Sequence, residues 1–223
     1  MSDFSWSDPQ SHTAFPVARA GYPFIFAAVF TTGVFALLGM NILALISLAV
    51  TFFICFFFRD PDRVVPNYIG AVVSPADGKV VFAGPVDNNR FVDGLCIKIS
   101  IFMSIFNVHV NRIPHEGRVK AVNYYPGKFF SANLNKASKH NEHNAVFVET
   151  EKGKNICTVQ IAGLIARRII CKLQEGDTVV RGGRFGIICF GSRLDVYLPP
   201  DTTLNVAVGN RVKAGTSVLG DMK

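Results

Sequence analysis

The stretch RFGIICFGSRLDVYLPP (184–200) decides the fold of the larger part of this chain. It holds two short segments, FGIICF (185–190) and LDVYLP (194–199), rich in the β-branched and aromatic residues that are typical of strands. Gly191-Ser192 separates them, and such a pair commonly marks a turn. The stretch therefore predicts two β-strands separated by a bend rather than a helix.

Similar β-rich segments recur on both sides of this stretch, with turn residues between them. No helical period is sustained among them, except a short one across 129–140. We therefore expect residues 59–223 to form a mostly β domain, an antiparallel sandwich or compact barrel with some helix. The segments are KVVFAG (79–84), LCIKISIF (95–102), VHVNRI (108–113), RVKAVNYY (118–125), NAVFVET (144–150), ICTVQIAG (156–163), RRIICKL (167–173), TVVRG (178–182) and TLNVAV (203–208).

The N-terminal part follows a different pattern, with 39 uncharged residues between the first and second arginines. They divide at Gly39-Met40-Asn41, a natural turn, into two apolar runs at 22–39 and 41–58. Each run is close to the roughly 20 residues that cross a bilayer as a helix. We expect residues 20–58 to form a hydrophobic helical hairpin associated with a membrane. A hairpin buried in a protein core and a shallow hairpin in one leaflet are the alternatives.

The flanks of this hairpin predict its orientation. Residues 1–19 form a polar N-terminal segment, and RDPDRVVP (59–66) is typical of a linker because its prolines block helix continuation. A hairpin places both ends on one side, and Arg19, Arg59 and Arg63 flank it. The positive-inside tendency therefore favours the cytoplasmic face of the cell (inner) membrane. A secretory signal peptide fits poorly, since the apolar run is too long and lacks a basic leader.

The charge of residues 59–223 indicates an anionic partner. This part contains 22 of the 23 Lys and Arg and 14 of the 16 Asp and Glu, a net charge of +8. Near an anionic membrane each basic group contributes about 1 kcal/mol to binding. Nucleic acid is the usual rival for a basic domain, but the basic residues here are scattered along the chain. We expect a membrane lipid as partner and no nucleic acid.

The cysteines indicate neither a metal site nor a disulfide framework. Cys55, Cys96, Cys157, Cys171 and Cys189 contain no CxxC pair and no metal-like spacing with histidine. Their number is odd. We expect buried free thiols in a reducing compartment.

Gly191-Ser192 also carries a chemical possibility. The Ser192 hydroxyl can attack the Gly191 carbonyl, which has no Cβ to hinder the approach. An ester then replaces the amide, and β-elimination cuts the chain into 1–191 and 192–223. Loss of ammonia from the serine remnant leaves a covalent pyruvoyl group on the new N-terminus. The chain would thereby make its own ketone cofactor.

Six stretches, in this order and at plausible separations, closely resemble the short form of phosphatidylserine decarboxylase. The resemblance implies a pyruvoyl-dependent carboxy-lyase that converts phosphatidylserine into phosphatidylethanolamine and CO2 through a Schiff base to the pyruvoyl group. It also implies a heterodimer of the two self-cleaved chains, and leaves a higher oligomer open. The stretches are FFFRDPDR (56–63), SPADGKV (74–80), NVHVNRIPHEG (107–117), HNEHN (140–144), QIAGLIARRI (160–169) and FGSRLDVYLP (190–199).

Activation of the Ser192 hydroxyl requires a base. His109 is our candidate, because alternation in NVHVNR predicts a strand that fixes its side chain. Asp77, at a Pro-Ala-Asp-Gly turn, would orient and charge-balance it as in a Ser-His-Asp relay. Longer members of the family resemble Y-H-x-x-H-x-P in this stretch. Arg112 occupies the position of their second histidine in this chain. Arg112 and His115 are therefore secondary candidates.

The lipid substrate carries a phosphodiester and a carboxylate, so its site should hold cations or N–H donors. Arg167 and Arg168 are candidates, and adjacent strand residues point to opposite faces. We also expect His140 and Asn144, in a polar cluster, to bind substrate. That cluster contains metal-like ligands, but the chemistry needs no metal and we expect none.

Two other classes of protein remain as alternatives. GDTVVRGGRFG (176–186) and GNRVKAGTSVLG (209–220) share a Gly-x-x-Val-x-x-Gly repeat that marks paired β-turns in biotinyl- and lipoyl-type carriers. A membrane-tethered carrier or binding module of that kind needs a modified lysine, and Lys79 lacks the flanking pattern. A purely structural membrane protein is the third possibility.

Overall fold

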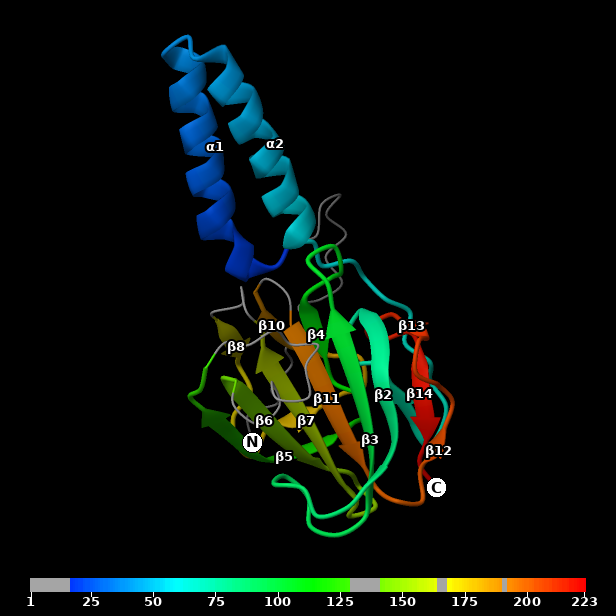
Figure 1. The fold of residues 1–223 in the computed structure, drawn as a ribbon. Helices are drawn as coiled ribbons and strands as arrows, with labels where there is room; N and C mark the ends of the chain where they lie inside the picture. The colour runs from blue at the N-terminus through cyan, green and yellow to red at the C-terminus, as the bar shows by residue number, and fades with distance from the viewer. Residues whose placement is uncertain (1–16, 129–140, 164–167, 190–191) are drawn as a thin grey trace. The chain divides into compact units, whose positions relative to one another are not determined.

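The structure is a computed structural model that describes residues 17–128, 141–163, 168–189 and 192–223 (Figure 1). Contacts divide the described chain into a helical unit that ends at Asp62 and a β unit from Arg63 to Lys223. The short helical period across 129–140 lies outside the described residues, as do residues 1–16.

The helical unit is the expected antiparallel pair. A short 3-10 helix, η1 (Arg19–Gly21), leads into α1 (Tyr22–Leu37), and α2 (Asn41–Phe57) returns. Gly39 makes the turn at a positive φ of 69°, a conformation open to glycine. Between the helices, the Thr32 hydroxyl lies 2.8 Å from that of Ser47. The predicted hairpin is confirmed at the level of secondary structure.

The surface of this pair is apolar. The stretch Arg19–Leu37 has a mean hydropathy of 1.7 with 6% of its residues buried, and it is long enough to cross a membrane by length and composition. Asn41–Phe57 is a shorter apolar helix. Large side chains such as Phe26 (80% exposed) and Leu37 (90% exposed) face outward.

The β unit is built from short and medium strands, most of them in the segments that the sequence predicts. They are β1 (Ala71–Val73), β2 (Gly78–Val86), β3 (Cys96–Met103), β4 (Val110–Arg112), β5 (Gly117–Tyr125), β6 (His143–Glu149), β7 (Asn155–Ala162), β8 (Ile169–Cys171), β9 (Thr178–Val179), β10 (Arg184–Ile188), β11 (Ser192–Leu198), β12 (Thr203–Leu204), β13 (Arg211–Val212) and β14 (Val218–Asp221).

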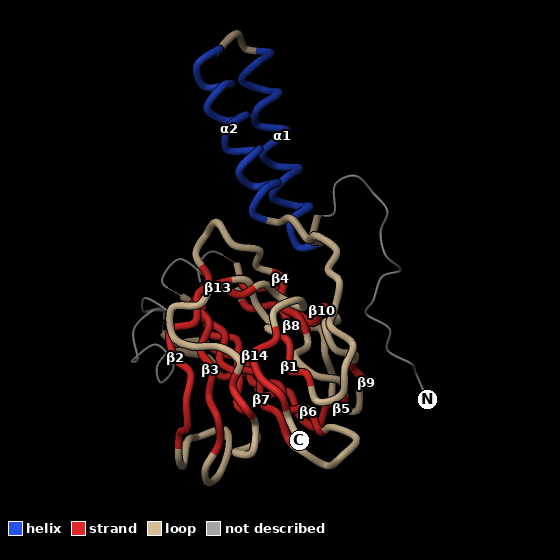
Figure 2. The backbone as a smooth tube through the Cα atoms, turned by 90° about the vertical axis from the view of Figure 1, so that its right-hand side faces the viewer, coloured by secondary structure: helices blue, strands red, loops and turns tan. Residues whose placement is uncertain are grey.

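The strands form antiparallel sheets that curl into a half-barrel, which confirms the expected mostly β fold (Figures 1 and 2). The eight-stranded sheet has the order β13-β2-β3-β11-β7-β6-β5-β9. Two three-stranded sheets have the orders β1-β14-β12 and β4-β10-β8. β11 therefore lies inside the large sheet, between β3 and β7.

The alternation along β11 gives the large sheet two buried faces. Leu194, Val196 and Leu198 belong to the main hydrophobic core. Tyr197 points the other way and packs in a smaller cluster with Cys157 and other apolar residues. Burying an aliphatic side chain of this size stabilises a fold by about 2 kcal/mol, so both faces hold β11 in place.

The Gly-x-x-Val-x-x-Gly repeat is structural in this domain. Its glycines Gly182 (φ 74°) and Gly215 (φ 71°) both have positive φ values. A Cβ added to Gly215 would lie 2.9 Å from Cδ of Arg112 and 3.7 Å from Cα of Gly182. The Arg112 Nη1 donates to the Gly182 carbonyl at 2.9 Å. Arg112 therefore lies where the two repeated turns meet.

Two details differ from the sequence-based expectation. TLNVAV forms a strand only at its start, β12, because the Asn210 side chain accepts a hydrogen bond from the Ala207 amide at 2.8 Å and turns the chain. β1, β13 and β14 were not expected. β1 and β14 come from opposite ends of the sequence of the β unit and pair with each other, with Ala71 opposite Asp221.

Candidate active site

Ser192 is the first residue of β11 and is fully buried. It is opposite Met103 of β3 and Ala162 of β7. Its hydroxyl donates to the Met103 sulfur at 3.3 Å. A thioether is a weak acceptor, so the hydroxyl is positioned without a strong bond to break. Gly191 lies outside the described residues.

The topology brings His109 to the chain segment that leads into Ser192. His109 immediately precedes β4, whose Val110 is opposite Ile187 of β10. β10 ends at Ile188, four positions before Ser192. His109 therefore lies beside the end of β10, and its side chain is fully buried. Alternation in NVHVNR had predicted that His109 lies inside a strand, but the strand begins one residue later.

A local hydrogen bond fixes the His109 ring. Its Nδ1 lies 2.9 Å from the carbonyl oxygen of Asn107. A carbonyl oxygen can only accept, so Nδ1 of the neutral ring carries the proton. Nε2 is then the basic nitrogen. This arrangement gives the ring the tautomer that a general base needs.

Asp77 lies at the start of β2, one strand beyond Met103. This position follows from the strand pairing two residues later, where Lys79 is opposite Phe102 of β3. The Asp77 Oδ1 accepts from the Ala214 amide at 2.7 Å, and Oδ2 pairs with Arg63 at 3.0 Å. Asp77 is thus a rigid, mostly buried carboxylate held by the Ala214 amide and Arg63. The Nδ1 proton that a Ser-His-Asp relay would give to Asp77 is instead donated to the Asn107 carbonyl, so for Asp77 only the charge-balancing role stays a prediction.

A row of buried amides leads to the serine. Asn144 donates to Gln160 at 3.1 Å, and Gln160 donates to the Asn111 side-chain oxygen at 2.8 Å. The Asn111 Nδ2 lies 3.9 Å from the Met103 sulfur that also accepts from Ser192. Asn144, expected to bind substrate, is part of this internal row. Sequence reasoning missed Gln160, although it is a polar residue inside the apolar segment ICTVQIAG.

A buried ion group lies on the other face of the same strand. Arg193 donates to both oxygens of Asp195, at 2.7 and 2.8 Å, and Lys98 is 3.0 Å from Asp195. Burial acts to raise the pKa of Asp195, but the Arg193 hydrogen bonds and charge outweigh it and lower the pKa. The group anchors the start of β11 directly after Ser192. The spacing Arg-x-Asp on one strand face is the sequence signal that indicates it.

The remaining substrate candidates divide between the described and undescribed parts. Arg168 is exposed, and its carbonyl accepts from the Cys189 amide at 3.2 Å. It is therefore close in space to the residues before Ser192. Arg167 and His140 lie outside the described residues.

The polar cluster around residue 143 is split by the pleat. His143 is opposite Ile161, which packs on the outer face of the sheet, whereas Asn144 points inward. Burial and the nearby Arg90 charge lower the pKa of His143. The ring stacks on Tyr125 at a centroid distance of 4.7 Å. His143 therefore belongs to an aromatic group on the outer face.

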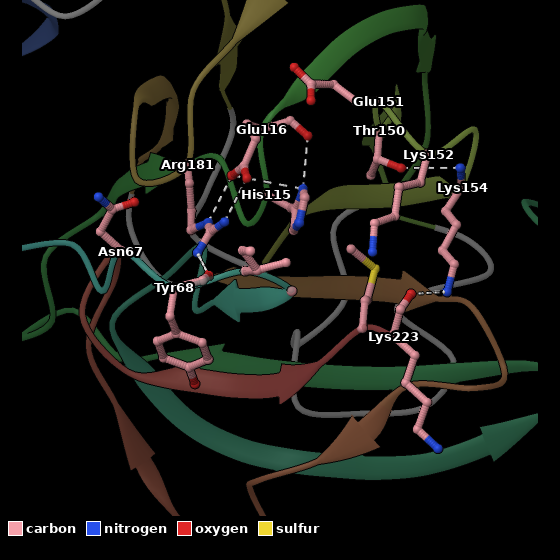
Figure 3. Close-up of a pocket in the computed structure, with 13 residues that line it drawn as sticks. Asn67, Tyr68, His115, Glu116, Thr150, Glu151, Lys152, Lys154, Arg181 and Lys223 are labelled. Carbon is pink, nitrogen blue, oxygen red and sulfur yellow. Dashed lines mark hydrogen bonds and ion pairs between the residues drawn. The ribbon is translucent and has the colours of Figure 1, made fainter.

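His115 lines a separate pocket of about 380 Å³, shown in Figure 3. The pocket includes the β6–β7 turn at Thr150 and Lys154, whereas Ser192 is beside Ala162 at the other end of β7. The length of β7 alone separates the two ends by roughly 20 Å. The structure therefore does not bring His115 together with Ser192.

An ion pair holds this second pocket together (Figure 3). Arg181 bonds both carboxylate oxygens of Glu116, at 2.6 and 2.8 Å, and donates to the Tyr68 carbonyl at 2.6 Å. Burial acts to raise the pKa of Glu116, but the bonds and charge of Arg181 outweigh it and lower the pKa. These contacts fasten the segment around Tyr68, near the start of the β unit, to Arg181 and Glu116.

The described cysteines are all free, and three of them, Cys96, Cys157 and Cys189, are buried. Burial raises the pKa of the Cys157 and Cys189 thiols. Both are therefore protonated and unreactive at neutral pH.

Fold and site together define a class: an enzyme with a mostly β catalytic domain and an N-terminal apolar helix pair. The family model of phosphatidylserine decarboxylase matches residues 50–220. The chain is 50% identical over 207 residues to the phosphatidylserine decarboxylase proenzyme of Desulfotalea psychrophila, covering 93% of this chain and 97% of the relative. The corresponding proenzyme of Syntrophus aciditrophicus is 51% identical over 211 residues, with 94% and 98% covered. The chain belongs to the phosphatidylserine decarboxylase family.

These relatives confirm the resemblance that the six sequence stretches carry. They give no support to a biotinyl- or lipoyl-type carrier. The repeat that suggested a carrier instead forms the turns that meet at Arg112.

Proposed function

We propose that this chain is a phosphatidylserine decarboxylase proenzyme that cleaves itself between Gly191 and Ser192. The observation that carries the proposal is the placement of Ser192, buried at the first position of a central strand with its hydroxyl on a weak thioether acceptor. A serine with a structural role would be expected to bond a backbone or side-chain oxygen.

In the first step His109 Nε2 takes the proton of the Ser192 hydroxyl. The oxygen then attacks the Gly191 carbonyl carbon, the C–N bond breaks, and the departing Ser192 nitrogen takes up the proton. The Asn107 carbonyl supports this role of the ring, because it holds the proton on Nδ1. Asp77 supplies negative charge near the resulting imidazolium.

The second step removes the α-proton of residue 192 and expels the Gly191 carboxylate. The remaining enamine takes up water and releases ammonia, which leaves a pyruvoyl group at the N-terminus of β11. Elimination competes with simple hydrolysis of the ester. Complete burial of Ser192 favours elimination, since it keeps bulk water away from the ester.

The fragment 192–223 stays bound after cleavage. Its strand β11 has seven residue pairs with β3 and six with β7. β12 and β14 form a sheet with β1, and β13 pairs with β2. These contacts support a heterodimer that separates only when the domain unfolds.

The pyruvoyl group fits this site because it is made from Ser192 itself, and its ketone would supply an electron sink for loss of CO2 from the serine headgroup. The residues of the chain bind and position the lipid. Arg168 is an exposed cation near the segment that precedes Ser192, where a phosphodiester can reach it. In this proposal His109 also returns a proton to the product, phosphatidylethanolamine.

The apolar helix pair and the net charge of +8 on residues 59–223 support a location on the cytoplasmic face of the cell (inner) membrane. A phospholipid substrate lies in a membrane, which agrees with an enzyme that associates with one. The same features fit the membrane association that the sequence predicts for residues 20–58.

Mass spectrometry of the purified protein tests the proposal. We expect fragments 1–191 and 192–223, the second with a blocked N-terminus. Cyanoborohydride treatment with phosphatidylserine should label the small fragment by reducing its adduct with the lipid amine. Ser192→Ala should stay intact and inactive, while Ser217→Ala, at a serine whose hydroxyl accepts from the Lys213 amide, should still cleave. An unbroken wild-type chain would refute the proposal.

A further inference from the structure

We propose that the turn Ser104–Asn107, with Phe106 at its tip and Lys79 and Arg211 beside it, is a docking surface for an anionic phospholipid bilayer. The inference assigns the part of the β unit that meets the lipid surface. The effect of this docking on the turnover of phosphatidylserine rests on the proposed function. Three features of the described residues carry it.

The first feature is a rigid turn that exposes an aromatic ring. The Ser104 amide and hydroxyl both donate to the Asn107 side-chain oxygen, at 2.9 and 2.8 Å. The Asn107 amide donates back to the Ser104 carbonyl at 2.9 Å. Phe106 in this closed turn is 64% exposed. A preorganised turn presents the ring without an ordering penalty on binding.

The second feature is the position of the turn at the end of the sheet that carries Ser192. The turn begins directly after Met103, the residue opposite Ser192. Figure 1 shows the β3–β4 connection projecting beyond the end of β3. A bilayer that takes up Phe106 would therefore face the end of the domain where the lipid headgroup has to arrive.

The third feature is a pair of like charges held side by side. Lys79 of β2 is directly opposite Arg211 of β13, and both are exposed. Neither has a carboxylate partner in the part of the chain that the structure describes. Like charges directly opposite on a sheet repel, and a shared anion would relieve the repulsion. Lys79 is also opposite Phe102, which is at most about 14 Å of chain from Phe106.

An aromatic ring with cations around it matches the interface of an anionic bilayer. The ring enters the boundary between headgroups and acyl chains, while the cations remain among the phosphates. The phospholipid class of the family's substrate favours this occupant over a protein partner. A second copy of the chain on the same surface is a separate outcome of the test below.

Tryptophan fluorescence tests the docking without any dependence on catalysis. The chain has one tryptophan, so Phe106→Trp in a Trp6→Phe background reports on position 106 alone. In full-length protein reconstituted into phosphatidylcholine vesicles with phosphatidylglycerol, brominated acyl chains should quench this tryptophan and its emission should shift to the blue. Lys79→Glu with Arg211→Glu should weaken quenching roughly tenfold or more in titrations with anionic lipid.

The matched control is Leu95→Trp in the same background. Leu95 is 56% exposed and directly precedes β3, so it lies at the opposite end of the strand that Phe106 follows. Its tryptophan should not be quenched. Equal quenching at both positions, or none at position 106, overturns the proposal. A change of sedimentation mass with Phe106→Ser instead would assign the surface to a second copy.

Turnover provides the second readout. For Phe106→Ser, kcat/KM should fall roughly tenfold on vesicle-bound phosphatidylserine and stay within about twofold on a monomeric short-chain phosphatidylserine. Phe106→Leu should recover most of the loss. An equal loss on both substrates, or no loss, overturns the proposal. A wild-type protein inactive on both would refute the proposed function, while the quenching result would still stand.

Discussion

Ser192 and Met103 are opposite each other across β11 and β3, and the serine hydroxyl donates to the methionine sulfur at 3.3 Å. The two residues are 89 positions apart in the chain. The pairing of β11 with β3 holds the candidate nucleophile at a fixed place, and the weakness of the sulfur acceptor leaves the hydroxyl proton available.

Met103→Leu tests the meaning of this contact. The substitution keeps the volume of the side chain, so stability should change by less than about 1.5 kcal/mol. Self-cleavage should proceed at a similar rate, because the thioether is only a weak acceptor. Electrophoresis of a time course after synthesis measures it. A block of cleavage in a folded Met103→Leu protein would show that the sulfur itself positions the hydroxyl.

His109→Gln should slow self-cleavage by roughly 10²- to 10⁴-fold, the usual contribution of a positioned general base. The matched control is His115→Gln, since His115 lines the separate pocket beyond the far end of β7. That variant should cleave at close to the normal rate. If His115→Gln is the slower of the two, the assignment of the base is wrong.

Gln160→Leu tests the buried row of amides. The change removes the partner of both Asn144 and Asn111 and leaves their polar atoms buried. We expect a loss of about 2 kcal/mol or more in the free energy of unfolding. Urea denaturation in a Ser192→Ala background measures it on an uncut chain. Thr178→Leu, at an exposed strand position, is a control that should change stability little.

Glu116→Gln tests the ion pair with Arg181. Because the pKa of Glu116 is lowered in the folded state, the pair contributes stability above the ordinary carboxyl pKa of 4.5 and loses it as pH falls through the folded value. At neutral pH the variant should lose at most about 1 kcal/mol, since the carboxylate is 42% exposed.

The difference between Glu116→Gln and the unchanged chain should therefore shrink as the pH is lowered below 4.5. Thermal denaturation in a pH series measures it. Glu151→Gln, which changes an exposed carboxylate that lines the same pocket but is not the one that Arg181 bonds, is the matched control. A difference that grows in acid would contradict the assignment.

Much of the secondary structure could be predicted from local sequence patterns. The helices begin and end within two residues of the expected runs, because 39 uncharged residues and Gly39 leave little choice of turn. The β11 strand was expected from LDVYLP and extends to Ser192. β1, by contrast, is three residues long and is stabilised by a partner near the C-terminus. Local patterns carry no information about such a partner.

The candidate site shows the same division. Gly191-Ser192 was identified from its chemistry, and His109 from alternation and family resemblance. The amides Asn111 and Gln160 come from different strands, and their contact depends on how the sheets curl. Asp195 of β11 and Lys98 of β3 also meet across strands, on the outer face of the eight-stranded sheet.

The sequence by itself determined the apolar helix pair and the β character of the remainder. It also indicated the bond between Gly191 and Ser192 as the candidate cleavage site. Each of these depends on neighbours along the chain. The tertiary structure decided that Ser192 is buried in a central strand. It decided that His109, and not His115, lies beside the end of β10, the strand that precedes Ser192. It also decided that Arg112 lies between two turns. The reason is physical: residue periodicity sets which face of a strand is apolar, but the choice of pairing partners follows from burying all such faces together.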